Sequence, residues 1–259
     1  MDGIAAFVLG LLQGITEFLP ISSTGHLYLG RHFFGLDEAG LFLDTMLHFG
    51  TLIAIIVFYK EEWLAILRRP FGRKSLLIIV ATIPAIVFGF LFKDFFDGLS
   101  KTGQTIGWEF LFTGGLLWLS ESVKEGHRKI DDLTAWDALF IGCFQATAIF
   151  PAVSRSGATL AASLLRKVDR DTAAYFSFLI STPAVAGALV LQARELFRGT
   201  VEQITPIPLL IATLSSALFG YLAIQWMIDF VKRHSLRIFA VYVWVLGAAV
   251  LILQWTGVF

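Results

Sequence analysis

The sequence has little charge. Asp, Glu, Lys and Arg together make up 15% of its 259 residues, whereas soluble domains carry about 25%. Hydrophobic residues make up 56% and the mean hydropathy is +0.75, which excludes a disordered chain because disorder requires low hydrophobicity. These proportions exclude an ordinary soluble domain and indicate an integral membrane protein.

The chain also has no net charge and only one cysteine. Lys and Arg number 20 against 20 Asp and Glu, which argues against a nucleic-acid partner because nucleic-acid-binding proteins show a basic excess. The single cysteine, Cys143, excludes an intramolecular disulfide and a metal site built from cysteines. We expect its thiol to be buried.

Long apolar segments account for most of the chain. A transmembrane helix needs about 20 apolar residues to cross about 30 Å of hydrocarbon, whereas strands of a membrane barrel alternate in hydrophobicity. The segments here are rich in Leu, Ile, Phe, Ala and Gly and do not alternate. The sequence therefore predicts an all-α integral membrane protein. Its six predicted transmembrane helices lie at 41–59, 75–92, 106–121, 172–191, 208–229 and 238–257.

Two further apolar stretches, 3–29 and 137–165, are interrupted near their middle. The interruptions read Phe-Leu-Pro-Ile-Ser-Ser-Thr-Gly at 18–25 and Phe-Pro-Ala-Val-Ser-Arg-Ser-Gly at 150–157. Non-helical backbone at membrane depth is tolerated only where protein buries it or where it lines a watery cavity. We interpret both stretches as re-entrant helix–loop–helix hairpins.

The distribution of basic residues supports this interpretation, because cytoplasmic loops carry an excess of Lys and Arg. If 137–165 turns back on itself, fourteen basic residues lie in the inner loops and five in the outer loops; if it spanned, the division would be ten to nine. The outer five are Arg31, Lys93, Lys101, Arg194 and Arg198. The first hairpin contains no Lys or Arg, so we place it by its likeness to the second.

The two hairpins match position by position. Counting from Gln13, the segment Ser-Ser-Thr-Gly occupies offsets nine to twelve; counting from Gln145, Ser-Arg-Ser-Gly occupies the same offsets. Three predicted spans follow each hairpin, so the hairpins enter from opposite faces and their loops meet near the midplane, as in inverted-repeat membrane proteins. We predict one polytopic domain over 1–259, with an inverted-topology repeat at about 1–130 and about 131–259.

Ionisable residues within the membrane are costly and are functional by default. Glu17 lies in an apolar run just before the first interruption, and Gln13 lies one helical turn earlier on the same face. Together they could orient a water, a metal or a hydroxyl. The alternative for Glu17 is a carboxylate that pairs with a neighbouring helix to fix packing, and Gln13 alone would be a helix–helix hydrogen bond.

Arg155 is the only arginine inside an apolar stretch, between Ser154 and Ser156 at a predicted helix N-terminus. Such a terminus binds anions through its free N–H groups, a guanidinium adds a bidentate clamp, and Thr159 could add a hydroxyl. The alternative is a structural pair between Arg155 and Glu17 without a ligand.

The first loop supplies Ser22, Ser23, Thr24, Gly25 and His26. Serines often only cap helices, but with Glu17 nearby this set suits nucleophile, base and orienting roles. Two anion-binding loops inside a bilayer indicate a ligand that is a phosphorylated or pyrophosphorylated lipid.

Other polar residues give weaker signals. We interpret Asp44 and His48 as an interface pair on one helix face. We expect Glu109 and Glu121, near predicted span ends, to reach water.

The residues from Gln13 to His26 resemble the [E/Q]xxxE segment and following serine loop of the bacterial undecaprenyl-diphosphate phosphatase family, the bacitracin-resistance membrane phosphatases. Residues Pro151 to Thr159 resemble its PGxSRSxxT motif, with Ala152 where the motif usually has Gly. The resemblance covers essentially the whole chain. It implies hydrolysis of undecaprenyl diphosphate to the monophosphate, which recycles the carrier lipid for peptidoglycan synthesis.

The resemblance also implies residue roles. Glu17, Ser23, His26 and Arg155 match catalytic positions. The phosphate-binding positions are Gln13, Thr24, Ser154, Arg155, Ser156 and Thr159. Ser23 would attack phosphorus with His26 or Glu17 as base, although a phosphohistidine at His26 or direct attack by water is also compatible.

The resemblance further implies a divalent cation, Mg or Ca, for which Glu17 is the candidate ligand, and a bacterial inner membrane protein whose active site opens to the extracytoplasmic side. The sequence leaves a homodimer open. Because broken helices in inverted repeats also build transporters, a flippase or transporter of lipid phosphates is the alternative function.

Overall fold

The computed structural model describes residues 1–36, 41–92, 95, 103–196 and 205–257. Within these ranges every regular element is a helix, apart from an isolated β-bridge between Arg128 and Val168. The helices are α1 (Gly3–Phe18), α2 (Ser23–Phe33), α3 (Leu41–Phe58), α4 (Lys60–Arg68), α5 (Arg73–Leu91), α7 (Ile106–Ser120), the 3-10 turn η1 (Ile130–Asp132), α8 (Ala135–Thr147), α9 (Arg155–Leu165), α10 (Arg170–Leu196), α11 (Pro206–Arg233) and α12 (Arg237–Trp255). Lys93, Lys101 and Arg198 of the predicted outer loops lie outside the described residues.

Four described helices are long and apolar enough to cross a membrane: α5, α10, α11 and α12. Helices α3 and α4 pass the same test only together, and the chain bends by 75° between them. Helix α7, predicted as a span at 106–121, has 15 residues, fewer than the roughly 20 that a perpendicular span needs. The structure thus confirms an all-helical, multi-pass membrane protein.

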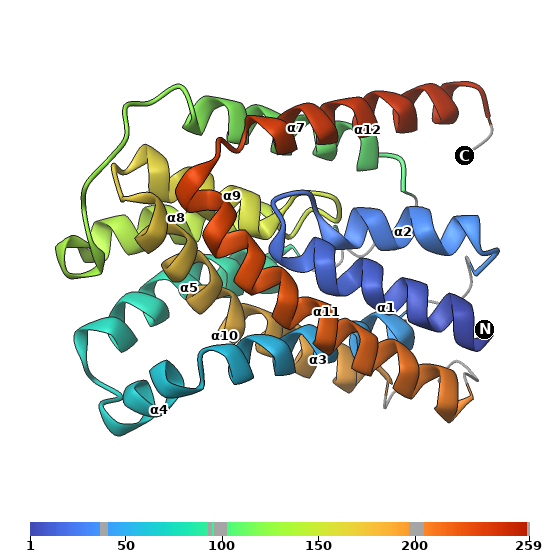
Figure 1. Ribbon diagram of the computed structural model, residues 1–259, viewed down its shortest axis with the longest axis horizontal. Coiled ribbons are helices and arrows are strands. Elements are labelled where there is room, and N and C mark those ends of the chain that lie inside the picture. The colour runs from blue at the N-terminus through green and yellow to red at the C-terminus, as the bar shows by residue number, and fades with distance from the viewer. Residues whose placement is uncertain (37–40, 93–94, 96–102, 197–204, 258–259) are drawn as a thin grey trace.

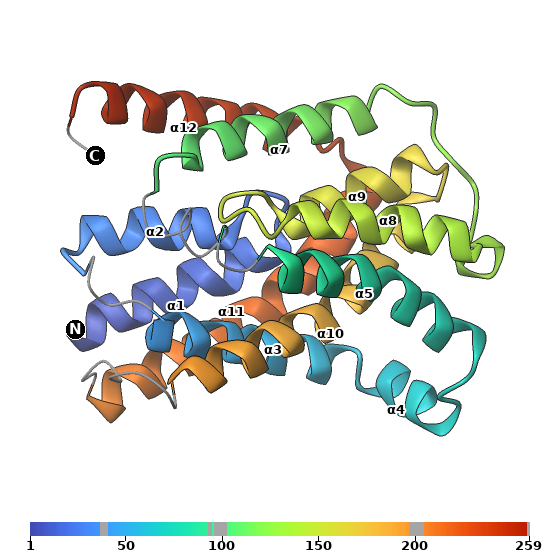
Figure 2. The ribbon, with the colours of Figure 1, turned by 180° about the vertical axis from the view of Figure 1, so that it is seen from behind.

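Both interrupted stretches fold as two helices joined by a short break. Helices α1 and α2 flank Leu19 to Ser22, and α8 and α9 flank Ala148 to Ser154. Figures 1 and 2 show the two hairpins reaching the middle of the molecule from opposite ends, with their tips side by side. The predicted helix–loop–helix form is therefore present in both.

The hairpins are held by equivalent partners. The first helix of the first hairpin, α1, packs along α11, and the first helix of the second hairpin, α8, packs along α5. Small residues allow both close contacts: a Cβ on Gly14 would lie 2.7 Å from the backbone N of Gly220, and a Cβ on Gly142 would collide with the carbonyl oxygen of Ala81. Small residues at such crossings bring helix backbones close together.

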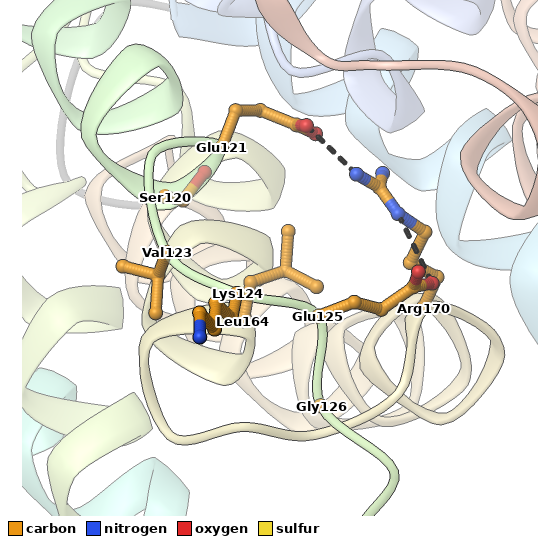
Figure 3. Close-up of a pocket in the computed structure, with 8 residues that line it drawn as sticks. All are labelled: Ser120, Glu121, Val123, Lys124, Glu125, Gly126, Leu164 and Arg170. Carbon is orange, nitrogen blue, oxygen red and sulfur yellow. Dashed lines mark hydrogen bonds and ion pairs between the residues drawn. The ribbon is translucent and has the colours of Figure 1, made fainter.

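The connection between the two halves is fixed by ion pairs at the end of α7. Arg170, at the start of α10, donates to the carboxylate of Glu121 at 2.7 Å, and its Nε lies 3.6 Å from Glu125. Figure 3 shows these side chains around a small pocket that contains none of the predicted site residues. We expected Glu121 to reach water, but its side chain is only 6% exposed and is paired with Arg170. This ion pair anchors the segment between α7 and α8.

The single thiol also departs from expectation. Cys143 is exposed on α8 and lies outside its buried face, which includes Ile141, Gly142 and Gln145.

Candidate active site

The tips of the two hairpins are joined by hydrogen bonds between their loops. The Ser156 hydroxyl donates to the carbonyl oxygen of Leu19 at 2.8 Å, and the Ser22 hydroxyl donates to that of Pro151 at 3.4 Å. Each loop also caps the helix that follows it: Ser22 Oγ accepts from the N–H of Gly25 at 3.4 Å, and Ser154 Oγ accepts from the N–H of Gly157 at 3.0 Å. Segments more than 120 residues apart in sequence therefore form one junction.

Glu17 is the centre of this junction. Its Oε1 accepts from Arg155 Nη2 at 2.5 Å, and its Oε2 accepts from Ser23 Oγ at 2.5 Å and from Gln13 Nε2 at 3.0 Å. The Glu17 side chain is only 5% exposed. One buried carboxylate thus brings together four of the predicted site residues, with the cation from one hairpin and the hydroxyl from the other.

His26 lies next to these residues in the chain, but its ring nitrogens contact Ser22 and Tyr242 instead of Glu17. Its Nδ1 is 2.6 Å from the carbonyl oxygen of Ser22, and its Nε2 is 2.8 Å from the hydroxyl of Tyr242 on α12. Because a carbonyl oxygen only accepts, Nδ1 carries the proton, and a neutral ring accepts from Tyr242 at Nε2. The ring therefore fixes the turn at Ser22, where φ is +70°.

The remaining predicted residues of the second loop are held by their neighbours. Ser154 Oγ lies 3.2 Å from Ser156 Oγ, and Thr159 Oγ1 lies 2.5 Å from Ser177 Oγ on α10. Thr24, in the first turn of α2, is half-buried, and among the described residues it makes no hydrogen bond to Glu17. In this arrangement only Arg155 of the second loop reaches the carboxylate.

His48 also belongs to this cluster, although from the sequence we interpreted it as half of an interface pair with Asp44. Its Nε2 lies 3.7 Å from Glu17 Oε2, while its Nδ1 is 2.8 Å from the carbonyl oxygen of Asp44. Asp44 itself pairs with Arg31 at 2.8 Å. The spacing of four between Asp44 and His48 was the available signal, but it does not reveal that α3 faces the end of α1.

Helix α7 holds the second loop through side chains that accept hydrogen bonds from the loop backbone. The carboxylate of Glu109 accepts from the N–H of Ala152 and from the Thr105 hydroxyl, and Thr113 Oγ1 accepts from the N–H of Ser154 at 3.1 Å. Glu109 is 5% exposed, so the expectation that it reaches water was wrong. A loop amide needs an acceptor when buried, and this carboxylate supplies it.

Metal-binding capacity at the junction is limited. The described residues include no group of three or more His, Cys, Asp or Glu that could hold a metal ion. One observation does fit a cation: Gln13 Oε1 is buried beside Glu17 and has no hydrogen-bond partner. Mg²⁺ typically binds through one or two carboxylates, with water and substrate phosphates completing the shell.

A tight crevice lies beside the cluster. It is lined by Glu17, Phe18, Thr51, Leu52, Ile55, Arg155, Ser181 and Val185. Fold and cluster together define a multi-pass helical membrane protein whose buried carboxylate, hydroxyl and guanidinium meet between two broken hairpins.

Comparison with known proteins identifies the family. Residues 6–249 match the family model described as bacitracin resistance protein BacA, and the chain belongs to this family. It is 60% identical over 259 residues to undecaprenyl-diphosphatase 3 of Bacillus cereus and to undecaprenyl-diphosphatase 4 of Bacillus thuringiensis strain Al Hakam, covering 100% of both chains in each case. It is 42% identical over 261 residues to undecaprenyl-diphosphatase of Carboxydothermus hydrogenoformans, again with complete coverage of both chains. The resemblance inferred from the paired motifs is confirmed.

Proposed function

We propose that this chain is an undecaprenyl-diphosphate phosphatase, which hydrolyses the terminal phosphate of the C55 carrier lipid to give undecaprenyl phosphate for peptidoglycan synthesis. Relatives that match it over their whole length are named undecaprenyl-diphosphatase. The observation that carries the proposal is the contact of Glu17 with both Ser23 and Arg155. Phosphoryl transfer needs a positioned nucleophile and a cation that neutralises developing charge. Ser23 could supply the first and Arg155 the second, and both contact the Glu17 carboxylate.

In the reaction we propose, Ser23 Oγ attacks the terminal phosphorus and its proton passes to Glu17. The bond from that phosphorus to the bridging oxygen breaks, undecaprenyl phosphate leaves, and water then hydrolyses the phosphoserine to inorganic phosphate. The 2.5 Å contact between Ser23 Oγ and Glu17 Oε2 favours Glu17 over His26 as the base. His26, held by Ser22 and Tyr242, positions the loop that carries Ser23.

Arg155 changes partners in this account. Its side chain is 15% exposed and lies on Glu17, so an incoming phosphate competes with the carboxylate for the guanidinium. A guanidinium binds phosphate oxygens bidentately, and the N-terminal turn of α9, which Ser154 caps and which contains Ser156 and Thr159, favours a bound anion. Release of Glu17 from Arg155 would leave the carboxylate free to accept the proton of Ser23.

We also propose a divalent cation, Mg or Ca, at this junction. Glu17 and Gln13 would hold it, because Gln13 Oε1 is an unpartnered buried acceptor. When bound, it would neutralise charge on the phosphate oxygens. Addition of a chelator is expected to lower phosphate release, and added Mg or Ca to restore it; full activity in chelator would contradict the proposal.

The membrane arrangement we propose has six transmembrane helices, with α3 and α7 joining the four long ones, and two re-entrant hairpins. The repeats are residues 1–130 and 131–259, inserted with opposite orientation in the bacterial inner membrane, with the site open to the extracytoplasmic side. The matched packing of α1 on α11 and of α8 on α5 supports this, as does the basic excess of the inner loops. Single cysteines in a Cys143→Ser background, placed at Lys129 and at Phe34, should react with a membrane-impermeant reagent from opposite sides. Labelling of both from the same side would contradict it.

The test of the function is phosphate release from undecaprenyl diphosphate by the detergent-purified protein, for wild type and for Ser23→Ala. We expect release by wild type and its loss in the variant. A lipid-phosphate flippase would need no nucleophile, so reconstituted transport that survives Ser23→Ala, with no phosphate release by wild type, would favour that function instead.

A further inference from the structure

His48 reaches the junction from α3 with one ring nitrogen hydrogen-bonded and the other turned toward Glu17. Its Nδ1 lies 2.8 Å from the carbonyl oxygen of Asp44, and its Nε2 lies 3.7 Å from Glu17 Oε2. Because a carbonyl oxygen only accepts, Nδ1 carries the proton, and Nε2 of the neutral ring presents a lone pair. A lone pair and a carboxylate oxygen repel each other, so a positive charge between them would stabilise this arrangement.

The distance between these two atoms fits a shared metal ion better than a hydrogen bond. Hydrogen bonds from N–H to oxygen span about 2.7–3.2 Å, and 3.7 Å exceeds this range. Two atoms that each lie about 2.1 Å from one ion are about 3 Å apart when adjacent and about 4.2 Å apart when opposite. Since 3.7 Å falls between these limits, an ion bound to both atoms requires little movement of either side chain.

The amide of Gln13 lies at the same carboxylate oxygen. Gln13 is fully buried, its Nε2 lies 3.0 Å from Glu17 Oε2, and its Oε1 has no hydrogen-bond partner. Glu17 Oε2 is therefore flanked by an amide with a spare oxygen and by an imidazole nitrogen with a lone pair. Amide oxygens, carboxylates and neutral imidazoles all bind metal ions.

The ring of His48 is also oriented as in metal-binding histidines. Such a histidine donates its second N–H to a carboxylate or a backbone carbonyl, which fixes the tautomer and the direction of the ring. His48 does this through Nδ1 and Asp44. His26, in contrast, has both ring nitrogens engaged, by the Ser22 carbonyl and the Tyr242 hydroxyl, and has none left for an ion.

We propose that Nε2 of His48 is the third protein ligand of the divalent cation, beside Glu17 and Gln13. This inference rests on the proposed function, which places a cation at the junction, and it narrows the identity of the ion. Ca²⁺ and Mg²⁺ take oxygen ligands, whereas imidazole favours transition ions. Because Mn²⁺ is the transition ion that also accepts oxygen ligands readily, this mixed site should bind Mn²⁺ more tightly than Ca²⁺ or Mg²⁺.

The test uses Mn²⁺ as a paramagnetic probe on the detergent-purified protein, without substrate. Electron spin echo modulation detects a nitrogen nucleus bound to Mn²⁺, and protein grown with ¹⁵N-labelled histidine distinguishes an imidazole from the amide of Gln13. We expect coupling to a histidine nitrogen in wild type and its loss in His48→Gln. The matched control is His127→Gln, which changes an exposed histidine between α7 and η1 and should retain the coupling.

Affinities of the same variants provide a second readout. His48→Gln replaces the nitrogen by an amide oxygen and should weaken Mn²⁺ binding by about tenfold or more, the loss typical of a disturbed metal-ligand shell. Binding of Ca²⁺, which accepts an amide oxygen, should change by less than about twofold. Thermal unfolding without metal monitors folding, and His48→Asn takes the place of His48→Gln if the latter fails to fold.

Mn²⁺ bound without histidine coupling, coupling that persists in His48→Gln, or a wild-type protein that binds no Mn²⁺ would overturn the proposal. Absence of phosphate release by wild type would instead contradict the proposed function. The spectra, recorded without substrate, would still decide whether His48 binds the ion.

Discussion

Replacement of Glu109 by Ala tests whether α7 holds the catalytic loop in place. Glu109 is 5% exposed and accepts hydrogen bonds from the N–H of Ala152 and the hydroxyl of Thr105. The substitution leaves the fully buried N–H of Ala152 without an acceptor and removes the partner of the half-buried Thr105 hydroxyl. A buried unsatisfied donor costs about 1–3 kcal/mol, so we expect the free energy of unfolding to fall by about 1–3 kcal/mol.

The same substitution should slow the reaction. Ala152 precedes Arg155 by three residues in a loop with only short hydrogen-bonded turns, so a shift of the loop backbone moves the guanidinium. A misplacement of about 1 Å can lower the rate about a hundredfold. We therefore expect Glu109→Ala to lower kcat by about tenfold to a hundredfold, measured as phosphate release alongside thermal unfolding in the same detergent.

Two further variants separate support from chemistry. Glu109→Gln keeps an oxygen that can accept from Ala152 and should recover most of the lost kcat and stability. Thr113→Val removes only the acceptor for the N–H of Ser154 and should have a smaller effect of the same kind. Wild-type kcat and unfolding in Glu109→Ala would refute this reasoning. Equal losses in Glu109→Gln and Glu109→Ala would show that the carboxylate acts on the reaction itself.

Three other predictions follow from single contacts. Arg155→Ala should lower kcat by about a thousandfold or more, as expected for an arginine that neutralises transferring phosphate, and Arg155→Lys should restore little because the fork is lost; retention of most activity in a phosphate-release assay would contradict the clamp. Burial alone would raise the pKa of Asp137, but hydrogen bonds, first that from Arg128, outweigh it and hold the pKa below its usual range. Its ion pairs therefore stabilise the fold at neutral pH and lose this effect as pH falls below about 4. Asp137→Asn should be less stable than wild type at pH 7 by about 1–3 kcal/mol, and in a pH series of unfolding curves the difference should shrink in acid; a constant difference would be the contrary result. Tyr242→Phe removes the partner of His26 Nε2 and should lower kcat about fivefold, the equivalent of about 1 kcal/mol for one neutral hydrogen bond, whereas an unchanged kcat would show that the ring needs no such anchor.

Local pattern was enough to predict the hairpins and their meeting point. The matching offsets from Gln13 and Gln145 predicted that the breaks at 22–25 and 154–157 meet. The structure joins Glu17, just before the first break, to Arg155 at the second. The proline, serine and glycine residues in each break act locally, on capping and on backbone conformation, so a sequence reveals them directly.

Contacts between distant helices could not be predicted in the same way. His48, Glu109 and Tyr242 each reach the site from a helix whose rotation is set by packing along its whole length. Hydropathy does not specify that rotation in a membrane, where lipid and protein interior are both apolar. Glu109 therefore looked like a residue near a span end, and Cys143 looked buried although it is exposed.

The most direct test of the account is a search for the phosphorylated enzyme. Undecaprenyl diphosphate radiolabelled at its terminal phosphate would be mixed with the purified protein, the reaction stopped in denaturing detergent at neutral and at acid pH, and the labelled peptide identified by mass spectrometry. We predict label on Ser23 that survives acid and is absent from Ser23→Ala. Acid-labile label on His26, or turnover with no labelled residue at any time point, would contradict the assignment of Ser23 as the nucleophile.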